Sequence, residues 1–241
     1  MSSAGGALAI VQARMSSTRL PGKTLAEVNG EPMLLLLLRR LSHARRLGGI
    51  VVATSTDASD DPIVGVAISA GVAVSRGPQR DVLERFLLAI GDREDPIVRI
   101  TADCPLIDPA IVDDTVEGFL SVAGCAYASN IQPRTFPDGL DVEVIDAAAL
   151  RAVGREPLEI EDREHVTSAI RAQPGRFRQA AVVGACHLGE LRWTVDEPED
   201  LEFVRTLVRR LGARRHEAGL AEILSAVRAE PSLAAYHGCR G

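Results

Sequence analysis

The sequence predicts an α/β fold with a mostly parallel sheet and helices on both of its faces. Short apolar runs rich in Val and Ile recur about 20 to 25 residues apart, which is the spacing of βαβ units. Between them lie segments with apolar residues at spacings of three and four, the period of a helix. The chain has 241 residues, 46% of them hydrophobic. This is enough to bury the core of one large α/β domain.

The first four apolar runs are predicted to be strands at the centre of this sheet. Each run is short, continuous and bounded by polar residues, as expected of a strand that is buried on both faces. These runs are Ala7 to Val11, Gly49 to Ala53, Val72 to Val74 and Ile97 to Ile100.

The segments between and after these strands are predicted to be helices. Helical periodicity covers Met33 to Leu47, Asp60 to Ala70 and Asp81 to Ile90. A fourth helix is predicted over Pro109 to Leu120, because Asp108 can act as its N-cap and proline is favoured in the first turn.

After Gly124 the alternation of strand and helix becomes less regular, and closely spaced Pro and Gly indicate a shaped loop. Three further strands are predicted at Ala126 to Ile131, Leu140 to Ile145 and Arg192 to Val195. Three further helices are predicted at Ile160 to Ala172, Pro198 to Leu211 and Glu217 to Ala229. With no internal repeat or low-complexity linker, residues 1–241 are predicted to form one domain with an inserted lobe at about 126–190.

Composition argues against two classes of partner. A net charge of -6 and a pI of about 5.5 leave no basic face for a nucleic-acid backbone, so a small substrate is expected instead. The longest apolar run, Met33 to Leu38, is far shorter than the roughly 20 residues that cross a membrane. Met1 to Gly6 lacks the features of a signal peptide. We therefore expect a cytoplasmic protein without membrane or nucleic-acid partners.

The loop from Gln12 to Thr24, with the sequence QARMSSTRLPGKT, is the first candidate site. It places three cations and several hydroxyls at the carboxyl end of a strand, where open α/β sheets bind ligands. Lys23 is the only lysine among 27 cationic residues, and a compact ammonium differs from arginine at a tight phosphate site. The loop therefore suits a polyphosphate, with a solvated basic loop as the alternative.

The end of this loop, Gly22-Lys23-Thr24, also matches the end of a P-loop motif. We do not expect a P-loop here, for two reasons. Ser17 stands where the motif needs its first glycine, and a turn at Asn29 to Pro32 leaves no room for the required helix.

Two acidic residues at predicted strand ends are the second and third candidates. Asp103 lies at the tip of the predicted central strand, and Asp196 ends the last predicted strand. The Asp103 carboxylate faces the crevice of the first loop and can bring Mg²⁺ and phosphate together, whereas Asp196 can be either a helix cap or a metal ligand. As an alternative, Asp103 caps the turn before Pro105, and Asp196 caps the helix that follows it. Dipole complementation explains the acidic residues of that helix's first turn, Glu197, Glu199 and Asp200.

Two further polar segments are candidates. Glu161 to Thr167 contains His165, the only histidine in a strongly polar setting, with a charged helix start as the alternative. Thr135 to Glu143 carries three carboxylates. On a strand, Asp141 and Glu143 would point the same way, which suits either a polyhydroxylated ligand or a solvated strand face.

From Ile10 to about Leu211 the chain resembles the SpsF-type cytidylyltransferases, relatives of CMP-Kdo synthetase and acylneuraminate cytidylyltransferase. Several motifs in the right order carry the resemblance, and together they are far more specific than any one. They are QARMSSTRLPGK at 12–23, VAT at 52–54, RITADCPLID at 99–108, DGLDVE at 138–143, REHVT at 163–167 and RWTVD at 192–196. One departure is Ala102, where relatives usually carry Gly.

This resemblance implies a GT-A-like nucleotidyltransferase fold, CTP as substrate, Mg²⁺ as cofactor and a homodimer. The implied reaction transfers a cytidylyl group from CTP to a small acidic sugar or sugar phosphate and releases pyrophosphate. The product would be an activated sugar for surface polysaccharide synthesis.

The resemblance also implies roles for particular residues. Asp103 and Asp196 resemble the metal ligands, and Lys23, Arg14 and Asp103 are the implied catalytic set. The implied nucleotide-binding residues are Gln12, Ala13, Arg14, Arg19, Lys23, Thr54, Arg76 and Asp103. The implied substrate-binding residues are Asp141, Arg163, His165 and Arg192. No general base is evident.

Two other functions remain as alternatives. A GT-A glycosyltransferase would use Asp103 and Mg²⁺ to bind a sugar nucleotide, but such enzymes usually carry an Asp-x-Asp pair. A non-catalytic nucleotide-binding module would keep the pocket without turnover. The presence of Lys23, Asp103 and Asp196 together argues against it.

Overall fold

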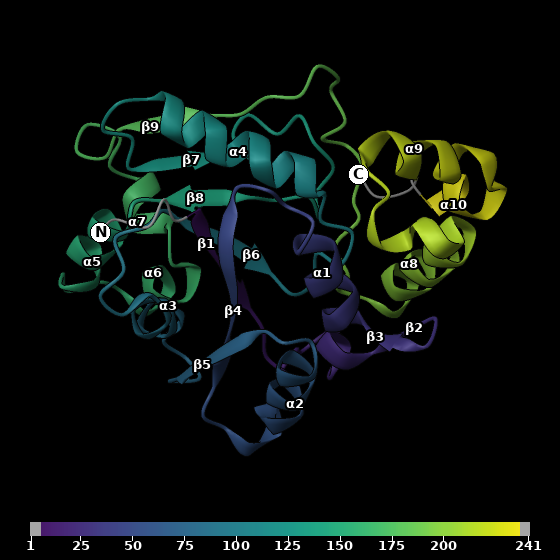
Figure 1. Cartoon of the computed structure of the whole chain (residues 1–241), viewed down its shortest axis with the longest axis horizontal. Coiled ribbons are helices and arrows are strands. Elements are labelled where there is room, and N and C mark those ends of the chain that lie inside the picture. Colours follow the sequence, from purple (N-terminus) through teal and green to yellow (C-terminus); the bar gives the residue numbers. More distant parts are fainter. Residues whose placement is uncertain (1–5, 237–241) are drawn as a thin grey trace.

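The computed structural model describes residues 6–236, and these form the predicted α/β fold around a seven-stranded sheet (Figure 1). The strand order is β5-β4-β1-β6-β8-β7-β9. Strands β5, β4, β1 and β6 are mutually parallel, whereas β8 runs antiparallel to both of its neighbours. The strands are β1 (Ala7–Gln12), β4 (Leu47–Ser55), β5 (Ala73–Gly77), β6 (Ile97–Thr101), β7 (Tyr127–Ser129), β8 (Glu143–Ile145) and β9 (Gln179–Ala181).

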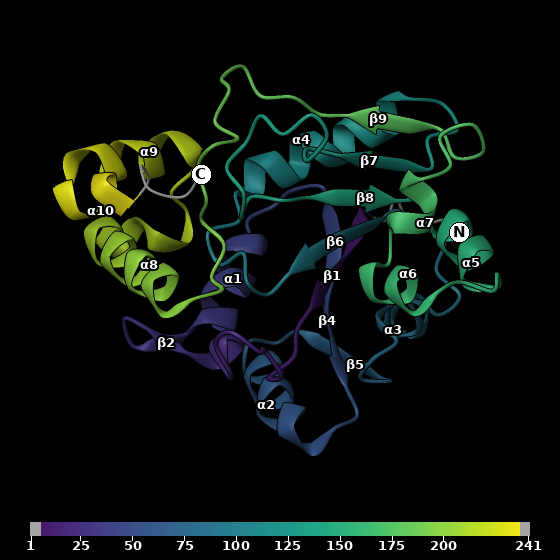
Figure 2. The same ribbon diagram turned by 180° about the vertical axis from the view of Figure 1, so that it is seen from behind.

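Helices cover both faces of the sheet, as the alternating pattern predicts (Figures 1 and 2). One face packs against α1 (Met33–Leu41), α2 (Asp61–Ser69), α4 (Pro109–Ser121), α8 (Pro198–Leu211) and α9 (Leu220–Ala229). The other packs against α3 (Val82–Ile90), α5 (Ala147–Gly154) and α7 (Ser168–Arg171), and α6 (Ile160–His165) lies against α3. Helix α10 (Pro231–Tyr236) follows α9. Three 3₁₀ helices are η1 (Lys23–Leu25), η2 (Ala58–Asp60) and η3 (Gly212–His216). A small hairpin joins β2 (Glu27–Val28) to β3 (Glu31–Pro32).

Strand β1 shows why its sequence is apolar without a break. Ala9 and Val11 lie in the core beneath α1 and α4, while Leu8 and Ile10 lie in the core on the opposite face. Successive side chains of a strand point to opposite faces, so a strand with helices on both sides buries every residue. The strand ends at Gln12, where the chain leaves the core.

Two predicted elements are wrong in their extent or type. The helix predicted over 160–172 is broken between α6 and α7, because Val166 has a positive φ of 61° and Thr167 turns inward to donate a hydrogen bond to Glu143. The strand predicted over 192–195 is only an isolated bridge between Arg192 and Asp138. The backbone of this segment forms hydrogen bonds outside the sheet instead, for example from Val195 N–H to the Asp103 carbonyl oxygen at 2.9 Å.

Other boundaries shift by several residues. The first predicted helix ends at Leu41 rather than at residue 47, because Leu47 already begins β4. Helix α9 begins at Leu220, and α5, α10 and β9 were not predicted. Strands β7, β8 and β9 of the predicted lobe belong to the same sheet as β1. Residues 1–5, which the localisation prediction uses, lie outside the described residues.

Within residues 6–236, no helix combines the length and the hydropathy that crossing a membrane requires.

Candidate active site

A pocket of about 230 Å³ lies at the carboxyl ends of β1 and β6, where the chain leaves the sheet. It brings the basic loop after β1 together with both acidic residues predicted at strand ends. Its lining residues are Gln12, Arg14, Ser16, Ser17, Thr18, Arg19, Lys23, Thr24, Thr101, Ala102, Asp103 and Asp196. Cationic, hydroxyl and carboxylate groups therefore face one cavity.

The basic loop is held in a compact shape by its own backbone. Gly22 has a φ of 75°, a conformation that glycine adopts without strain, and its N–H donates to the Met15 carbonyl at 3.0 Å. The Thr24 hydroxyl donates to the Arg14 carbonyl at 2.8 Å. The loop folds back on itself, and Lys23 begins the 3₁₀ helix η1 at its end. This fold points the lysine into the pocket.

Asp60 anchors the loop from below and was not predicted as part of the site. Its side chain is buried, and one carboxylate oxygen accepts a hydrogen bond from Met15 N–H at 2.7 Å. The other oxygen accepts from the hydroxyls of Ser55 and Thr54 at 2.5 and 3.1 Å. Asp60 thus ties the basic loop to the end of β4. The sequence gives no signal for this contact, because 45 residues separate Asp60 from Met15.

The Lys23 ammonium is the centre of the pocket. It lies 3.2 Å from a carboxylate oxygen of Asp103, 2.8 Å from one of Asp196 and 2.7 Å from the backbone carbonyl oxygen of Val195. An ammonium has three N–H donors, so all of them are used. The two carboxylates predicted to act together therefore share one cationic partner.

Asp196 is surrounded by cations. Besides Lys23, Arg19 lies 2.8 Å from one of its oxygens and Arg192 lies 2.5 Å from the other. Burial alone raises the pKa of Asp196, but the hydrogen bond and charge of Lys23, with the two arginines, outweigh burial and hold the pKa below its ordinary value. Asp196 is therefore ionised at neutral pH.

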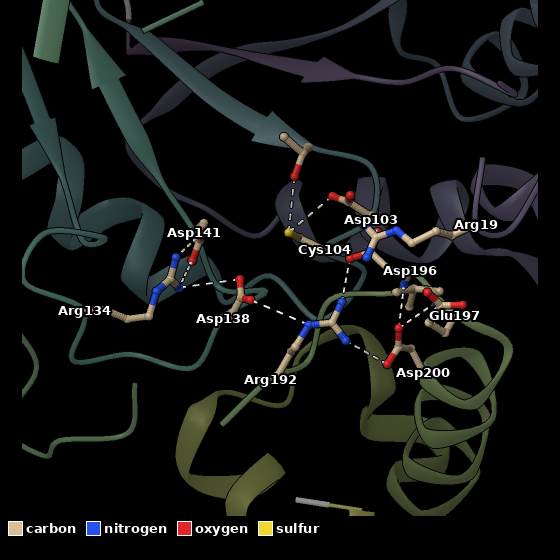
Figure 3. A network of polar contacts seen from close by, with 12 residues as sticks. Arg19, Asp103, Cys104, Arg134, Asp138, Asp141, Arg192, Asp196, Glu197 and Asp200 are labelled. Atoms are coloured by element: carbon tan, nitrogen blue, oxygen red, sulfur yellow. Dashed lines mark hydrogen bonds and ion pairs between the residues drawn. The ribbon is translucent and has the colours of Figure 1, made fainter. Parts of the chain in front are cut away.

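The Arg192 guanidinium lies between Asp138 on one side and Asp196 and Asp200 on the other (Figure 3). It contacts Asp200 at 2.9 Å and Asp138 at 3.8 Å, in addition to Asp196. Asp200 in turn accepts hydrogen bonds from the backbone N–H groups of Asp196 and Glu197 at 2.8 and 2.7 Å. Arg192 and Asp200 thus fix the Asp196 carboxylate at the start of α8. This supports the structural role predicted for Asp200.

The oxygen donors around Lys23 fit a hard divalent cation. Two carboxylate oxygens and one carbonyl oxygen converge on the ammonium, and Mg²⁺ prefers such ligands. Mg²⁺ typically takes one or two carboxylates and completes its shell with water and substrate phosphates. Across residues 6–236, no cluster of three His, Cys, Asp or Glu side chains offers a fuller cage. Asp103 and Asp196 could hold Mg²⁺ once Lys23 turns toward an anionic ligand.

Three residues that the resemblance assigned to the nucleotide do not line this pocket. Thr54 is fully buried and donates its hydroxyl to Asp60. Ala13 is also buried, at 1% exposure. Arg76 donates to the Ser55 carbonyl at 2.8 Å, at the edge of β5. These side chains support the strand ends around the pocket.

The residues predicted on the substrate side do not line the pocket. Asp141 and Arg192 belong to one ion-pair network, which runs through Arg134 and Asp138 to Asp196 (Figure 3), whereas Arg163 and His165 lie on α6. Asp141 forms an ion pair with Arg134 at 2.6 Å, and Arg163 forms one with Asp81 at 2.6 Å. His165 is exposed at the end of α6. The expectation that Asp141 and Glu143 point the same way from one strand is wrong, because β8 begins only at Glu143 and that side chain is buried.

Comparison with known proteins finds relatives that match nearly the whole chain. A family model described as "Cytidylyltransferase" matches residues 8–228. The spore coat polysaccharide biosynthesis protein SpsF of Bacillus subtilis (strain 168) is 31% identical over 94% of this chain and 96% of its own length.

Solved structures show the same fold. A cytidylyltransferase from Leptospira borgpetersenii serovar Hardjo-bovis has a TM-score of 0.89 at 29% identity, covering 95% of this chain and 96% of its own. CMP:2-keto-3-deoxy-manno-octonic acid synthetase complexed with CTP has a TM-score of 0.66 at 16% identity. The match covers 85% of this chain and 99% of the synthetase chain.

Proposed function

The chain belongs to the cytidylyltransferase family, and we propose from this premise that it transfers a cytidylyl group from CTP to an acidic sugar or sugar phosphate and releases pyrophosphate. One observation carries the proposal. A loop with Arg14, Arg19 and Lys23 faces Asp103 and Asp196 across a single pocket. Cations for a triphosphate tail and oxygen ligands for a divalent metal therefore lie within reach of one another.

In this reaction an oxygen of the acceptor attacks the α-phosphorus of CTP, and the bond from that phosphorus to the bridging oxygen of the β-phosphate breaks. The protein mainly positions the reactants and neutralises charge. Arg14, Arg19 and Lys23 bind the triphosphate, and their charge stabilises the pyrophosphate that leaves. Mg²⁺ held by Asp103 and Asp196 would neutralise phosphate charge and lower the pKa of an acceptor hydroxyl.

Lys23 has two positions in this scheme. In the free chain it neutralises Asp103 and Asp196, so two carboxylates lie side by side without repulsion. A triphosphate in the pocket would draw the ammonium toward the phosphates, and Asp103 and Asp196 would then be free to hold the metal. Lys23 would thus neutralise the two carboxylates before CTP binds and neutralise the triphosphate afterwards.

The proposed function is tested by incubating the chain with each of the four nucleoside triphosphates, Mg²⁺ and a panel of acceptors. The panel holds 3-deoxy-manno-octulosonate, N-acetylneuraminate, hexose phosphates and a phosphonate. We expect pyrophosphate release only with CTP and with one class of acceptor. We also expect CTP with Mg²⁺ to raise the melting temperature more than the other triphosphates do. Equal stabilisation by all four, or no pyrophosphate with any acceptor, would argue against the proposal.

We also propose a homodimer that forms through the lobe at about 126–190. This follows the resemblance, and the lobe contains the edge strand β9 and the exposed side chain of Val183. Light scattering of the purified chain is expected to give twice the chain mass of 25.7 kDa. Val183→Glu is expected to shift the mass toward the monomer, and a monomeric wild-type chain would disprove the dimer.

A further inference from the structure

A buried polar cluster lies on the sheet face that packs against α3, α5 and α7. At its centre Glu143 of β8 forms an ion pair with Arg99 of β6. The Tyr127 hydroxyl and the Thr167 hydroxyl each donate to the same Glu143 oxygen at 2.7 Å. Glu143 is 3% exposed, and three donors fix its position, from β6, from β7 and from the segment between α6 and α7. None of these four residues lines the pocket.

The contacts within this cluster determine the protonation states of Glu143 and Tyr127. Burial raises the pKa of Glu143, but Arg99 and the two hydroxyl donors outweigh burial, so the pKa lies below its ordinary value. Burial next to this carboxylate raises the pKa of Tyr127, which stays neutral. Glu143 is therefore ionised at neutral pH and forms a buried ion pair with Arg99, so removing one residue would leave the other buried without its partner.

The cluster reaches the pocket through one residue. The second terminal nitrogen of Arg99 donates to the side-chain oxygen of Gln12 at 3.2 Å, and Gln12 lines the pocket at the end of β1. A guanidinium has donors and no acceptor, so the amide oxygen of Gln12 must face Arg99. The amide NH₂ then faces away from Arg99. Among the described residues, no protein group accepts a hydrogen bond from that NH₂.

We propose that Gln12 presents its NH₂ to an oxygen of the nucleoside part of CTP, and that Arg99 and Glu143 are positioning residues that fix the amide in this orientation. The proposal rests on the proposed function. The phosphates have three cations on the loop, Arg14, Arg19 and Lys23, and a neutral amide adds little beside them. A neutral donor suits a ribose hydroxyl or a base carbonyl, which carries no charge.

The test is Gln12→Glu, measured with two ligands in the presence of Mg²⁺. Glutamate has nearly the same shape but offers only acceptors, so it keeps the contact with Arg99 and turns an oxygen toward the nucleoside. We expect the affinity for CTP to fall about tenfold or more. The hydrogen bond from the amide is lost, and a glutamate oxygen, which only accepts hydrogen bonds, then faces the accepting oxygen of the nucleoside. Inorganic tripolyphosphate is the second ligand. It engages only the cationic loop. The new charge weakens its binding as it weakens that of CTP, but no hydrogen bond is lost, so its affinity should fall clearly less than that of CTP.

The melting temperature separates this role from a structural one. Glutamate beside Arg99 adds an ion pair, so Gln12→Glu should melt at or above the wild-type temperature while it binds CTP less tightly. An unchanged CTP affinity, or an equal loss for CTP and tripolyphosphate, would overturn the proposal. If wild-type chain does not bind CTP at all, the proposed function fails instead, so the two failures are distinguishable.

Arg99→Lys tests the positioning role. Lysine keeps the charge beside Glu143 but loses the planar fork that serves Glu143 and Gln12 together. We expect CTP affinity to fall about three- to tenfold, with tripolyphosphate affinity unchanged. Arg40→Lys is the matched control, because Arg40 is fully buried and donates to backbone carbonyls far from the pocket, such as that of Ile107. It should lower the melting temperature only. Equal losses for both ligands in Arg99→Lys would assign Arg99 a purely structural role.

Discussion

Asp103→Ala is expected to reduce pyrophosphate release from CTP by about a thousandfold or more. The variant removes one of two carboxylates available to a metal in the pocket, and electrostatic stabilisation of this kind is worth several kcal/mol in a transition state. The fold should persist. Lys23 keeps its contacts with Asp196 and Val195, and the Asp103 side chain is 30% exposed. The measurement is pyrophosphate release at saturating CTP and Mg²⁺, with a thermal melt of each variant.

The control for Asp103→Ala is Glu117→Ala. Glu117 is an exposed carboxylate that forms an ion pair with Arg46 at 2.6 Å and does not line the pocket. An exposed pair contributes little to stability, so both turnover and melting temperature should stay near wild type. Turnover near the wild-type rate in Asp103→Ala would remove the catalytic assignment. A loss of melting temperature in that variant alone would show that Asp103 is structural.

Lys23→Met is expected to have two opposite effects. Turnover with CTP should fall about a hundredfold or more, because the pocket loses its most buried cation and the triphosphate loses a partner. In the absence of nucleotide, however, the affinity for Mn²⁺ should rise about tenfold or more. Removal of the ammonium leaves Asp103, Asp196 and the Val195 carbonyl without their shared cation. Electron paramagnetic resonance of free Mn²⁺ during titration measures this second effect without any turnover.

Lys23→Arg distinguishes charge from shape. Arginine keeps the charge, but its planar fork cannot occupy a point between three oxygens as an ammonium does. We expect Mn²⁺ affinity to stay near that of wild type, with turnover reduced. If Lys23→Met binds Mn²⁺ no more tightly than wild type, the carboxylates are not a metal site held by lysine, and their role would have to be reconsidered.

The regular elements of this fold could be predicted because local sequence dictates them. Strand β1 is apolar without a break from Ala7 to Val11, and α4 begins with Asp108 as N-cap, whose side chain accepts from Ala110 N–H at 2.9 Å. The helix break at Val166 could not be predicted in this way. It depends on a hydrogen bond from Thr167 to Glu143, 24 residues away in the chain, and tertiary contacts of this kind leave no local pattern.

The residues of the site also fall into those that local sequence predicts and those that depend on tertiary contacts. Asp103 and Lys23 follow strands and loops whose type is clear from sequence, and parallel strands end at one edge of a sheet, so their proximity could be predicted. The link from Asp60 to Met15 and the link from Arg99 to Gln12 join residues 45 and 87 positions apart. Buried polar side chains of this kind resemble ordinary surface residues in a single sequence. Only the structure shows that they support the pocket.

The most direct test of a metal and triphosphate site at this sheet edge is a crystal structure of the chain with CTP and Mn²⁺, with anomalous data collected at the manganese edge. We expect a manganese peak in contact with both Asp103 and Asp196, with Lys23 turned from these carboxylates to the phosphates. A peak that touches neither carboxylate, or a triphosphate bound away from the loop at 12–24, would contradict the assignment.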